Sequence, residues 1–309
     1  MKILVVGAGA IGGYFGAALL AAGRQVKFLV RERREQQLQR SGLVVHRPSG
    51  DLEIASPPTV QAAHLDGSYD LVLLSCKAYD LQSCIADFSN GMHDATLVLP
   101  LLNGMSHMDV LDAKFGSTRV LGGLARISTT LDAEGHIHQM GDLSTIVFGA
   151  RGAIAPALKA QVVADLNVPG FTSVPSDRIV QDMWEKWVFI AAAAALTSFM
   201  RGTVGDIVAA GARGIAEGLI QECAAISGEN GYPPGKQAID FAISLLTAAG
   251  SPFTASMFRD IENHSRIEAQ HLVGDLLLRS KAANPLLNIA HAHLRTYEVR
   301  REREGRFHD

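Results

Sequence analysis

Residues 2–23 read KILVVGAGAIGGYFGAALLAAG, and this stretch decides the fold. Its first five residues predict a buried strand, and residues 11–22 predict a helix. Between them three glycines form the pattern Gly-x-Gly-x-x-Gly, which permits a tight turn, close approach of the backbone to a pyrophosphate, and close packing of helix on strand. Phosphates bind at the N-terminus of such a helix. The predicted dinucleotide-binding residues are therefore Gly7, Ala8, Gly9, Ala10, Ile11 and Gly12.

The rest of the first half continues the alternation of short apolar runs with helical stretches. Near-continuous apolar runs are typical of strands that are covered on both faces of a parallel sheet. We therefore expect an α/β fold with an N-terminal Rossmann-type, doubly wound parallel sheet. Further strands are expected at residues 26–30, 71–75, 96–99, 137–148 and 171–174, with a strand or hairpin within 44–62 and a helix at 155–166.

After Pro175 the β-branched runs disappear and long helical periodicities take over. Proline and glycine residues cluster between 167 and 175, and such residues punctuate the connection between two domains. The sequence therefore predicts a dinucleotide-binding Rossmann domain at residues 1–175 and an all-helical domain at residues 176–309. The helices expected in the second domain span residues 179–200, 212–228, 236–248, 254–281 and 286–303.

The charge balance argues against a nucleic-acid partner. The 309 residues include 28 basic and 31 acidic side chains, a net charge of −3, whereas binding to a phosphate backbone needs a basic excess. The cysteines are odd in number and form no CxxC pair, so we expect neither a disulfide framework nor a zinc site, and a reducing cytoplasm fits best. These cysteines are Cys76, Cys84 and Cys223.

Two uncharged runs resemble membrane or export segments only superficially. Residues 3–23 contain six glycines, which make a poor apolar region for a signal peptide. Residues 187–200 are too few to cross a bilayer, which takes about 20 helical residues. We expect no membrane partner. The histidine pairs 136/138 and 291/293 have no third ligand nearby, so no metal site is expected either.

The end of the second predicted strand indicates which dinucleotide is bound. A site for NAD normally carries Asp or Glu there, where the carboxylate takes the ribose hydroxyl. In this chain Arg31 follows the strand, and Arg33 and Arg34 come soon after. A guanidinium forms bidentate charged hydrogen bonds with a 2′-phosphate, so we predict NADPH rather than NADH. The alternative is that these arginines are solvated loop charges.

Several motifs occur in order along the whole chain. They are the glycine stretch at 7–23, Arg31, CKA around Lys77, LNGM around Asn103, WEKW around Lys186, and the segment from Ser256 through Glu268. This ordered set resembles the ketopantoate reductase (2-dehydropantoate 2-reductase) family. The resemblance implies an oxidoreductase that uses NADPH to reduce a small 2-oxo acid, ketopantoate, to pantoate in pantothenate biosynthesis, with substrate bound by the helical domain.

The resemblance also implies roles for individual residues. Lys186 matches the family's general acid, and Glu268 its active-site glutamate, which touches the cofactor as well. Asn103 matches an asparagine that contacts both cofactor and substrate, Ser256 a substrate-binding serine, and Lys77 a cofactor-binding lysine. Lys186 would also bind substrate.

The residues alone leave other interpretations open. Lys186 lies one helical turn after Asp182, so it could be a surface lysine in an ion pair. The following turns are apolar, however, and an apolar neighbourhood disfavours the charged ammonium and makes the lysine a readier proton donor. Without the resemblance, Glu268 would be a solvated carboxylate in mid-helix and Ser256 a helix cap.

The chain departs from the family pattern beside Lys186. Ile190 and Ala194 stand where the family carries asparagines that hold the substrate, and Val204 replaces a further one. Loss of such contacts to a hydroxylated acid costs several kcal/mol, on the order of 10⁴ in selectivity. Two alternatives therefore stay open: a relative that reduces a more apolar 2-oxo acid, and a sensor that binds NADPH without turnover. The oligomeric state is also open, with a homodimer as one option.

Overall fold

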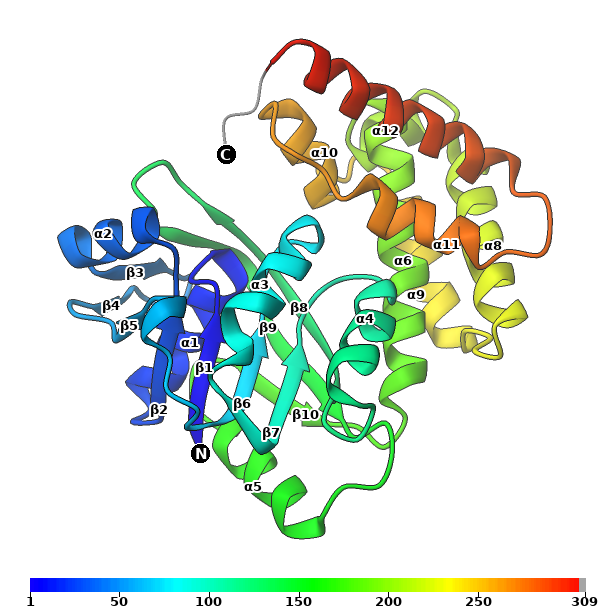
Figure 1. Cartoon of the computed structure of the whole chain (residues 1–309). Coiled ribbons are helices and arrows are strands. Elements are labelled where there is room, and N and C mark those ends of the chain that lie inside the picture. Colours follow the sequence, from blue (N-terminus) through cyan, green and yellow to red (C-terminus); the bar gives the residue numbers. More distant parts are fainter. Residues whose placement is uncertain (306–309) are drawn as a thin grey trace. The chain divides into compact units, whose positions relative to one another are not determined.

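The structure is a computed structural model that describes residues 1–305, so residues 306–309 of the expected second domain lie outside it. The chain forms two compact units (Figure 1). The first contains Met1–Leu102 and His107–Val180, and the second contains Asn103–Ser106 together with the residues from Gln181 onward. The first unit is built on a parallel sheet and the second is helical, which confirms the predicted fold class.

The central sheet of the first unit is parallel throughout and has the strand order β5-β2-β1-β6-β7. Ile3 in the central strand pairs with Val26 on one side and with Leu71 on the other. The connections therefore reverse direction beside β1, and the carboxyl edge at such a reversal is where ligands bind in open α/β sheets. The strands are β1 (Lys2–Val6), β2 (Gln25–Leu29), β5 (Thr59–Val60), β6 (Tyr69–Leu74) and β7 (Met92–Pro100).

A second, mixed sheet completes the first unit, with the order β10-β9-β3-β4 and with β8 paired to β9. The long antiparallel β8–β9 hairpin turns through Gly135, whose φ of +86° favours glycine. The extended stretch expected at 137–148 is strand β9, whereas the sequence analysis did not identify β8. The strands are β3 (Leu43–His46), β4 (Leu52–Ile54), β8 (Gly122–Leu131), β9 (Ile137–Gly149) and β10 (Thr172–Pro175).

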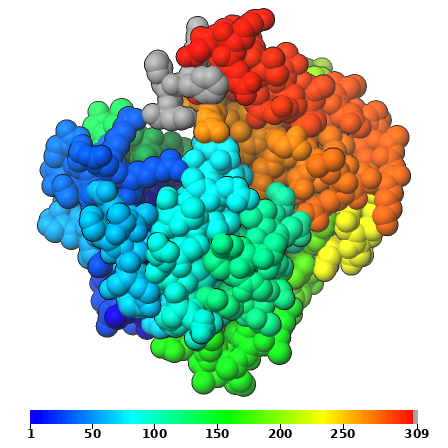
Figure 2. Space-filling model, viewed as in Figure 1, coloured from blue at the N-terminus to red at the C-terminus, as the bar shows by residue number. Residues whose placement is uncertain are grey.

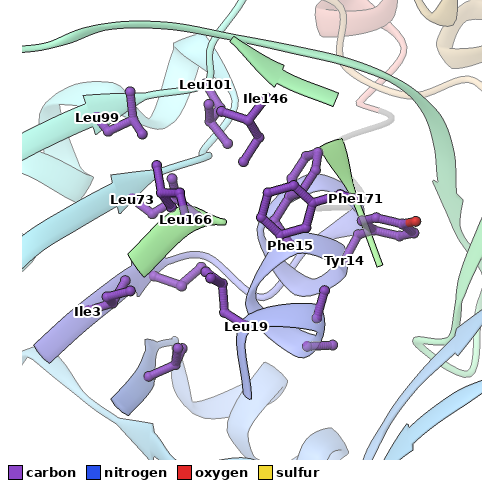
Figure 3. Packing of buried hydrophobic residues seen from close by; sticks show 14 of the residues in the cluster. Ile3, Tyr14, Phe15, Leu19, Leu73, Leu99, Leu101, Ile146, Leu166 and Phe171 are labelled. Atoms are coloured by element: carbon purple, nitrogen blue, oxygen red, sulfur yellow. The ribbon is translucent and has the colours of Figure 1, made fainter. Parts of the chain in front are cut away.

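Helix α1 (Ala10–Ala21) packs in the core that the two sheets share. Figure 3 shows Phe15 and Leu19 of this helix beside Ile3 and Leu73 of the central sheet and Ile146 of the second sheet. A helix that is apolar all round must be buried, and each such Leu or Phe contributes about 1.5–3 kcal/mol when it leaves water. The core thus fixes the helix that follows the glycine loop.

The other helical elements of this unit are α2 (Glu32–Ser41), η1 (Ala62–His64), η2 (Ala78–Asp80), α3 (Leu81–Ser89), α4 (Ser106–Phe115) and α5 (Pro156–Leu166). Two of them contribute to that core, α2 through Leu38 and α5 through Val162 and Leu166. Arg31 is the N-cap residue of α2, and Arg33 and Arg34 lie in its first turn, so these arginines stand at the start of a helix and not in a loop.

The second unit is organised around α6 (Ile179–Met200), which begins in the first unit and has buried alanines along most of its second half. Trp184 and Trp187 are almost fully buried, and the Trp187 indole donates a hydrogen bond to the Leu272 carbonyl at 2.9 Å. Figure 2 shows the orange and red surface of the C-terminal helices. The remaining elements are α7 (Val204–Ala209), α8 (Arg213–Glu229), α9 (Lys236–Leu246), α10 (Ser256–Glu262), the π-helical turn η3 (Gln270–Gly274), α11 (Asp275–Leu278) and α12 (Pro285–Arg303).

The expectation of one helix over 254–281 is wrong, because the chain breaks after α10. His264 adopts a φ of +54°, and its carbonyl accepts a hydrogen bond from Arg301 Nε at 2.9 Å. The next carbonyl, of Ser265, accepts one from the Tyr297 hydroxyl at 2.8 Å. These side chains of α12 bind carbonyls that a continuous helix would use itself. Glu268 consequently precedes a new helical segment instead of lying in mid-helix.

Candidate active site

The loop after β1 has the geometry that a pyrophosphate requires. Gly7 has a φ of +91°, and a Cβ on Gly12 would lie 2.1 Å from Ser75 Oγ and 2.2 Å from the Gly7 carbonyl oxygen. A Cβ on Gly9, by contrast, would project into open space with no atom within 4 Å. Gly9 is the N-cap of α1, and no side chain caps this helix. The first-turn N–H groups therefore suit an anion, and residues 7–12 fit a dinucleotide.

Three cationic side chains follow the strands whose carboxyl ends adjoin this loop. Arg31 is the N-cap residue of α2, and its exposed guanidinium donates to Ser83 Oγ at 3.0 Å and lies 3.4 Å from Asp80 Oδ1. Arg34 Nε donates to the Ala8 carbonyl at 2.9 Å. Lys77 is exposed just after β6. The site is thus basic, as binding of a phosphorylated ribose would require.

Arg34 was expected only as one of three neighbouring arginines, and its contact with the glycine loop distinguishes it from the other two. Its guanidinium is bound to the glycine loop, and burial lowers its pKa even though nearby Asp132 acts in the opposite direction. The group is nevertheless a guanidinium and stays charged in proteins. In the sequence, only its position three residues after Arg31, about one helical turn later, indicates that Arg34 could lie on the same side of the helix.

Lys186 of α6 and Asn103 are in direct contact. The half-buried Lys186 donates from Nζ to Asn103 Oδ1 at 2.8 Å. The Asn103 carbonyl in turn binds His271 Nε2 at 2.5 Å, and His271 Nδ1 lies 2.7 Å from Ser106 Oγ. Gly104 between them has a φ of +76°, and a Cβ there would lie 3.2 Å from His271 Nε2. The sequence analysis missed His271.

The other two expected residues of the helical unit, Ser256 and Glu268, lie on separate segments of that unit. Ser256 is exposed and is the first residue of α10, whose N-cap is Ala255, so its interpretation as a helix cap is wrong. Thr197 of α6 accepts a hydrogen bond from the Ala255 N–H at 3.2 Å and so anchors this point. Glu268 is half-buried, and its carbonyl accepts from the Leu272 N–H at 2.9 Å as the π-helical turn begins. The roles of Ser256 and Glu268 stay predictions.

The two positions that lie one and two turns after Lys186 on α6 are apolar. Ile190 is half-buried and Ala194 is 1% exposed, one and two turns after the lysine. Val204, at the start of α7, is fully buried. Neither Ile190 nor Ala194 can supply a hydrogen bond to a substrate hydroxyl.

Comparison with known families decides the assignment. Residues 3–152 match the family model described as "Ketopantoate reductase PanE/ApbA", and residues 178–298 match the model of its C-terminal part. The chain belongs to the ketopantoate reductase family. It is therefore an oxidoreductase that binds a nicotinamide cofactor, which in ketopantoate reductases is NADPH.

Individual relatives cover nearly the whole chain. The "uncharacterized oxidoreductase YkpB" of Bacillus subtilis is 35% identical over 304 residues, which are 97% of this chain and 99% of the relative. A 2-dehydropantoate 2-reductase of Archaeoglobus fulgidus is 24% identical over 286 residues, 91% of each chain. The resemblance inferred from the ordered motifs is thus confirmed.

Two solved structures share the fold. A PanE/ApbA family ketopantoate reductase from Ralstonia eutropha aligns with a TM-score of 0.87 at 24% identity, covering 98% of this chain and all of its own. D-mandelate dehydrogenase in a ternary complex with NADH and anilino(oxo)acetate aligns with a TM-score of 0.88 at 21% identity and the same coverage.

Residues 1–305 contain neither a helix that could span a membrane nor a cluster of metal ligands. No helix in this range combines the length and apolarity needed to cross a membrane. Nor does any group of three or more His, Cys, Asp or Glu side chains in this range suit a metal ion.

Proposed function

We propose that this protein reduces a 2-oxo acid to the 2-hydroxy acid with NADPH, and that Lys186 is the general acid. The hydrogen bond between Lys186 Nζ and Asn103 Oδ1 carries this proposal, because it joins two residues that are 83 positions apart in sequence. An amide oxygen can only accept, so the lysine Nζ is the donor in this contact and is held in place by it. Such positioned proton transfer contributes about 10²–10⁴ to a rate.

Each residue has a defined task in the reaction. Residues 7–12, Arg31 and Lys77 would hold NADPH, which when bound would supply the hydride for the C2 carbonyl carbon. Lys186 gives a proton from Nζ to the oxygen of that carbonyl as negative charge develops there. Asn103 holds the lysine through Oδ1, and its amide N–H donors serve substrate and nicotinamide. Glu268 orients lysine, substrate and cofactor.

Ser256 completes the proposed substrate site. Its hydroxyl is exposed at the start of α10, where the Thr197 contact fixes the preceding residue, and it binds the acid or its hydroxyl. The first candidate substrate is ketopantoate, whose reduction to pantoate belongs to pantothenate biosynthesis. This assignment rests on the family and on the ordered motifs.

Ile190 and Ala194 favour a second candidate, a more apolar 2-oxo acid. Without the asparagine amides of the family pattern, these two positions offer no hydrogen bond to a substrate hydroxyl, and a branched or aromatic side chain would lose less there than ketopantoate. The fold likeness to D-mandelate dehydrogenase with anilino(oxo)acetate supports testing such acids. We place the enzyme in the cytoplasm, which fits three cysteines that form no disulfide, and a homodimer is the proposed assembly.

The test is the loss of NADPH absorbance with purified protein and a panel of ketopantoate, branched and aromatic 2-oxo acids. Turnover with ketopantoate supports the first candidate, and turnover confined to apolar acids supports the second. NADPH binding without oxidation by any acid would instead favour a non-catalytic sensor.

Lys186→Ala tests the role of the general acid. We expect kcat to fall about 10²–10⁴-fold with the NADPH dissociation constant unchanged. Lys236→Ala is the matched control, because this lysine of the same unit is exposed and pairs only locally with Asp240 at 2.5 Å. Near-full turnover of Lys186→Ala would refute the mechanism.

A further inference from the structure

We propose that His271 is a positioning residue that sets the hydrogen bond between Asn103 and Lys186. The proposal rests on the role of Lys186 as general acid. His271 acts through the backbone of Asn103, whose carbonyl it binds at 2.5 Å while the side chain of the same residue binds the lysine at 2.8 Å.

The chemistry of the two partners fixes how the imidazole is bound. A backbone carbonyl only accepts, so His271 Nε2 carries the proton and donates it to Asn103. In the neutral ring Nδ1 then has a lone pair, which accepts from the Ser106 hydroxyl at 2.7 Å. When the ring is protonated, Nδ1 donates to the same oxygen. The bridge across residues 103–106 therefore persists in both charge states.

Close packing adds a second constraint on the same turn. Gly104 has a left-handed φ of +76°, and a Cβ at this position would meet the His271 side chain and carbonyl oxygen at 3.2–3.3 Å. Only glycine combines that φ with so close an approach. The turn and the imidazole therefore fit each other in one arrangement.

The contacts close into a ring that includes α6. Trp187 follows Lys186, and its indole donates to the Leu272 carbonyl at 2.9 Å. Leu272 follows His271, which binds Asn103, and Asn103 binds Lys186. Trp187 of α6 is thus bound directly to Leu272 of the π-helical turn, whereas its neighbour Lys186 is linked to His271 through Asn103. Such π-helical turns occur frequently at functional sites.

His271→Phe removes both hydrogen bonds and keeps a ring of similar size. We expect kcat to fall about 10- to 100-fold, because small misplacements of a catalytic group cost rates of this order. Because the amide of Asn103 also serves substrate and nicotinamide in the proposed function, the KM for the acid and the NADPH dissociation constant should rise as well, each by less than the fall in kcat. His271→Gln keeps an N–H donor for the Asn103 carbonyl and should recover most of kcat. His291→Phe is the control, because His291 Nε2 is buried without a hydrogen bond in the described chain.

A readout without substrate separates this proposal from the proposed function. The rate at which acetic anhydride labels Lys186, followed by mass spectrometry, should rise several-fold in His271→Phe and return in His271→Gln, since the lysine loses a fixed acceptor. If Lys186→Ala is inactive but His271→Phe keeps normal kcat and normal labelling, the positioning role is refuted and the proposed function stands.

A fully active Lys186→Ala variant would have a different meaning. If Lys186→Ala is fully active, the proposed function fails, and the labelling rate alone then decides whether His271 holds the lysine. Should His271→Phe not fold, Ser106→Ala removes only the Nδ1 partner and should lower kcat in the same direction by about threefold, which is within the range of one hydrogen bond. An unchanged kcat and labelling rate in Ser106→Ala would then overturn the proposal.

Discussion

Replacing two glycines of the same loop by alanine should give opposite results. In Gly12→Ala the new Cβ would lie 2.2 Å from the Gly7 carbonyl oxygen, about 1.2 Å short of an ordinary contact at 3.4 Å. Because a backbone atom cannot swing aside, we expect the upper range of overpacking costs, about 3 kcal/mol. For a unit of this size that corresponds to a fall in Tm of about 6–12 °C.

Gly9→Ala should leave the fold intact. Gly9 has a φ of −82°, which any residue can adopt, and the added Cβ would meet no atom within 4 Å. Its free energy of unfolding should therefore change by about 1 kcal/mol or less, in the direction of stabilisation. The same Cβ would occupy the space through which a pyrophosphate approaches the backbone, so the NADPH dissociation constant should rise at least about tenfold.

Calorimetry without ligand and fluorescence titration with NADPH measure the two effects on the same preparations. Gly23→Ala is not a suitable control because its φ is +76°, whereas Gly152→Ala adds a Cβ in open space away from the loop. If Gly9→Ala loses as much stability as Gly12→Ala, or if it binds NADPH normally, the assignment of this loop to the pyrophosphate is wrong.

Three further predictions concern single side chains. Arg31→Ala should raise the KM for NADPH about 10- to 100-fold, which corresponds to the free energy of a charged hydrogen bond, and should leave the KM for NADH unchanged. Equal changes in the two KM values would contradict a contact between Arg31 and the 2′-phosphate. Thr203→Ala should destabilise the protein in urea more at neutral pH than below about pH 4. The reason is that the hydrogen bonds of Thr203 lower the pKa of Asp206 in the folded protein. The stabilisation that they provide is therefore present above the pKa of Asp206 in the unfolded chain and is lost as the pH falls through its pKa in the folded protein. A loss of stability that does not depend on pH would refute this reasoning. A thiol reagent should label Cys84 in the native protein but Cys223 only after unfolding, because burial raises the pKa of the Cys223 thiol; native labelling of Cys223 would contradict its burial.

Local apolar patterns predicted much of the fold. The first strand and α6 have the bounds that their sequence pattern predicted, because both are buried over most of their length. Helix α2 lacked any such pattern, since Leu38 is its single fully buried residue. The break at His264 was also invisible locally, because Arg301, 37 residues further on, holds the His264 carbonyl.

The candidate site was predictable only as a set of separate residues. The ordered motifs named Lys186 and Asn103, but only the folded chain shows that they share a hydrogen bond. His271 carries no local signal, because its partners Ser106 and Asn103 lie 165 and 168 residues away. Arg34 was one of three arginines in sequence, and its contact with Ala8 singles it out.

The membership of Asn103–Ser106 in the helical unit has a consequence for dissecting the protein into fragments. These four residues are flanked on both sides by chain that belongs to the α/β unit, so no single cut separates the two units. A fragment ending at Val180 would carry the Asn103 acceptor away from Lys186, and the complementary fragment would retain His271 without its carbonyl partner. Split-gene expression at this boundary should therefore yield two pieces that restore a complete hydrogen-bond ring only when they reassemble in trans.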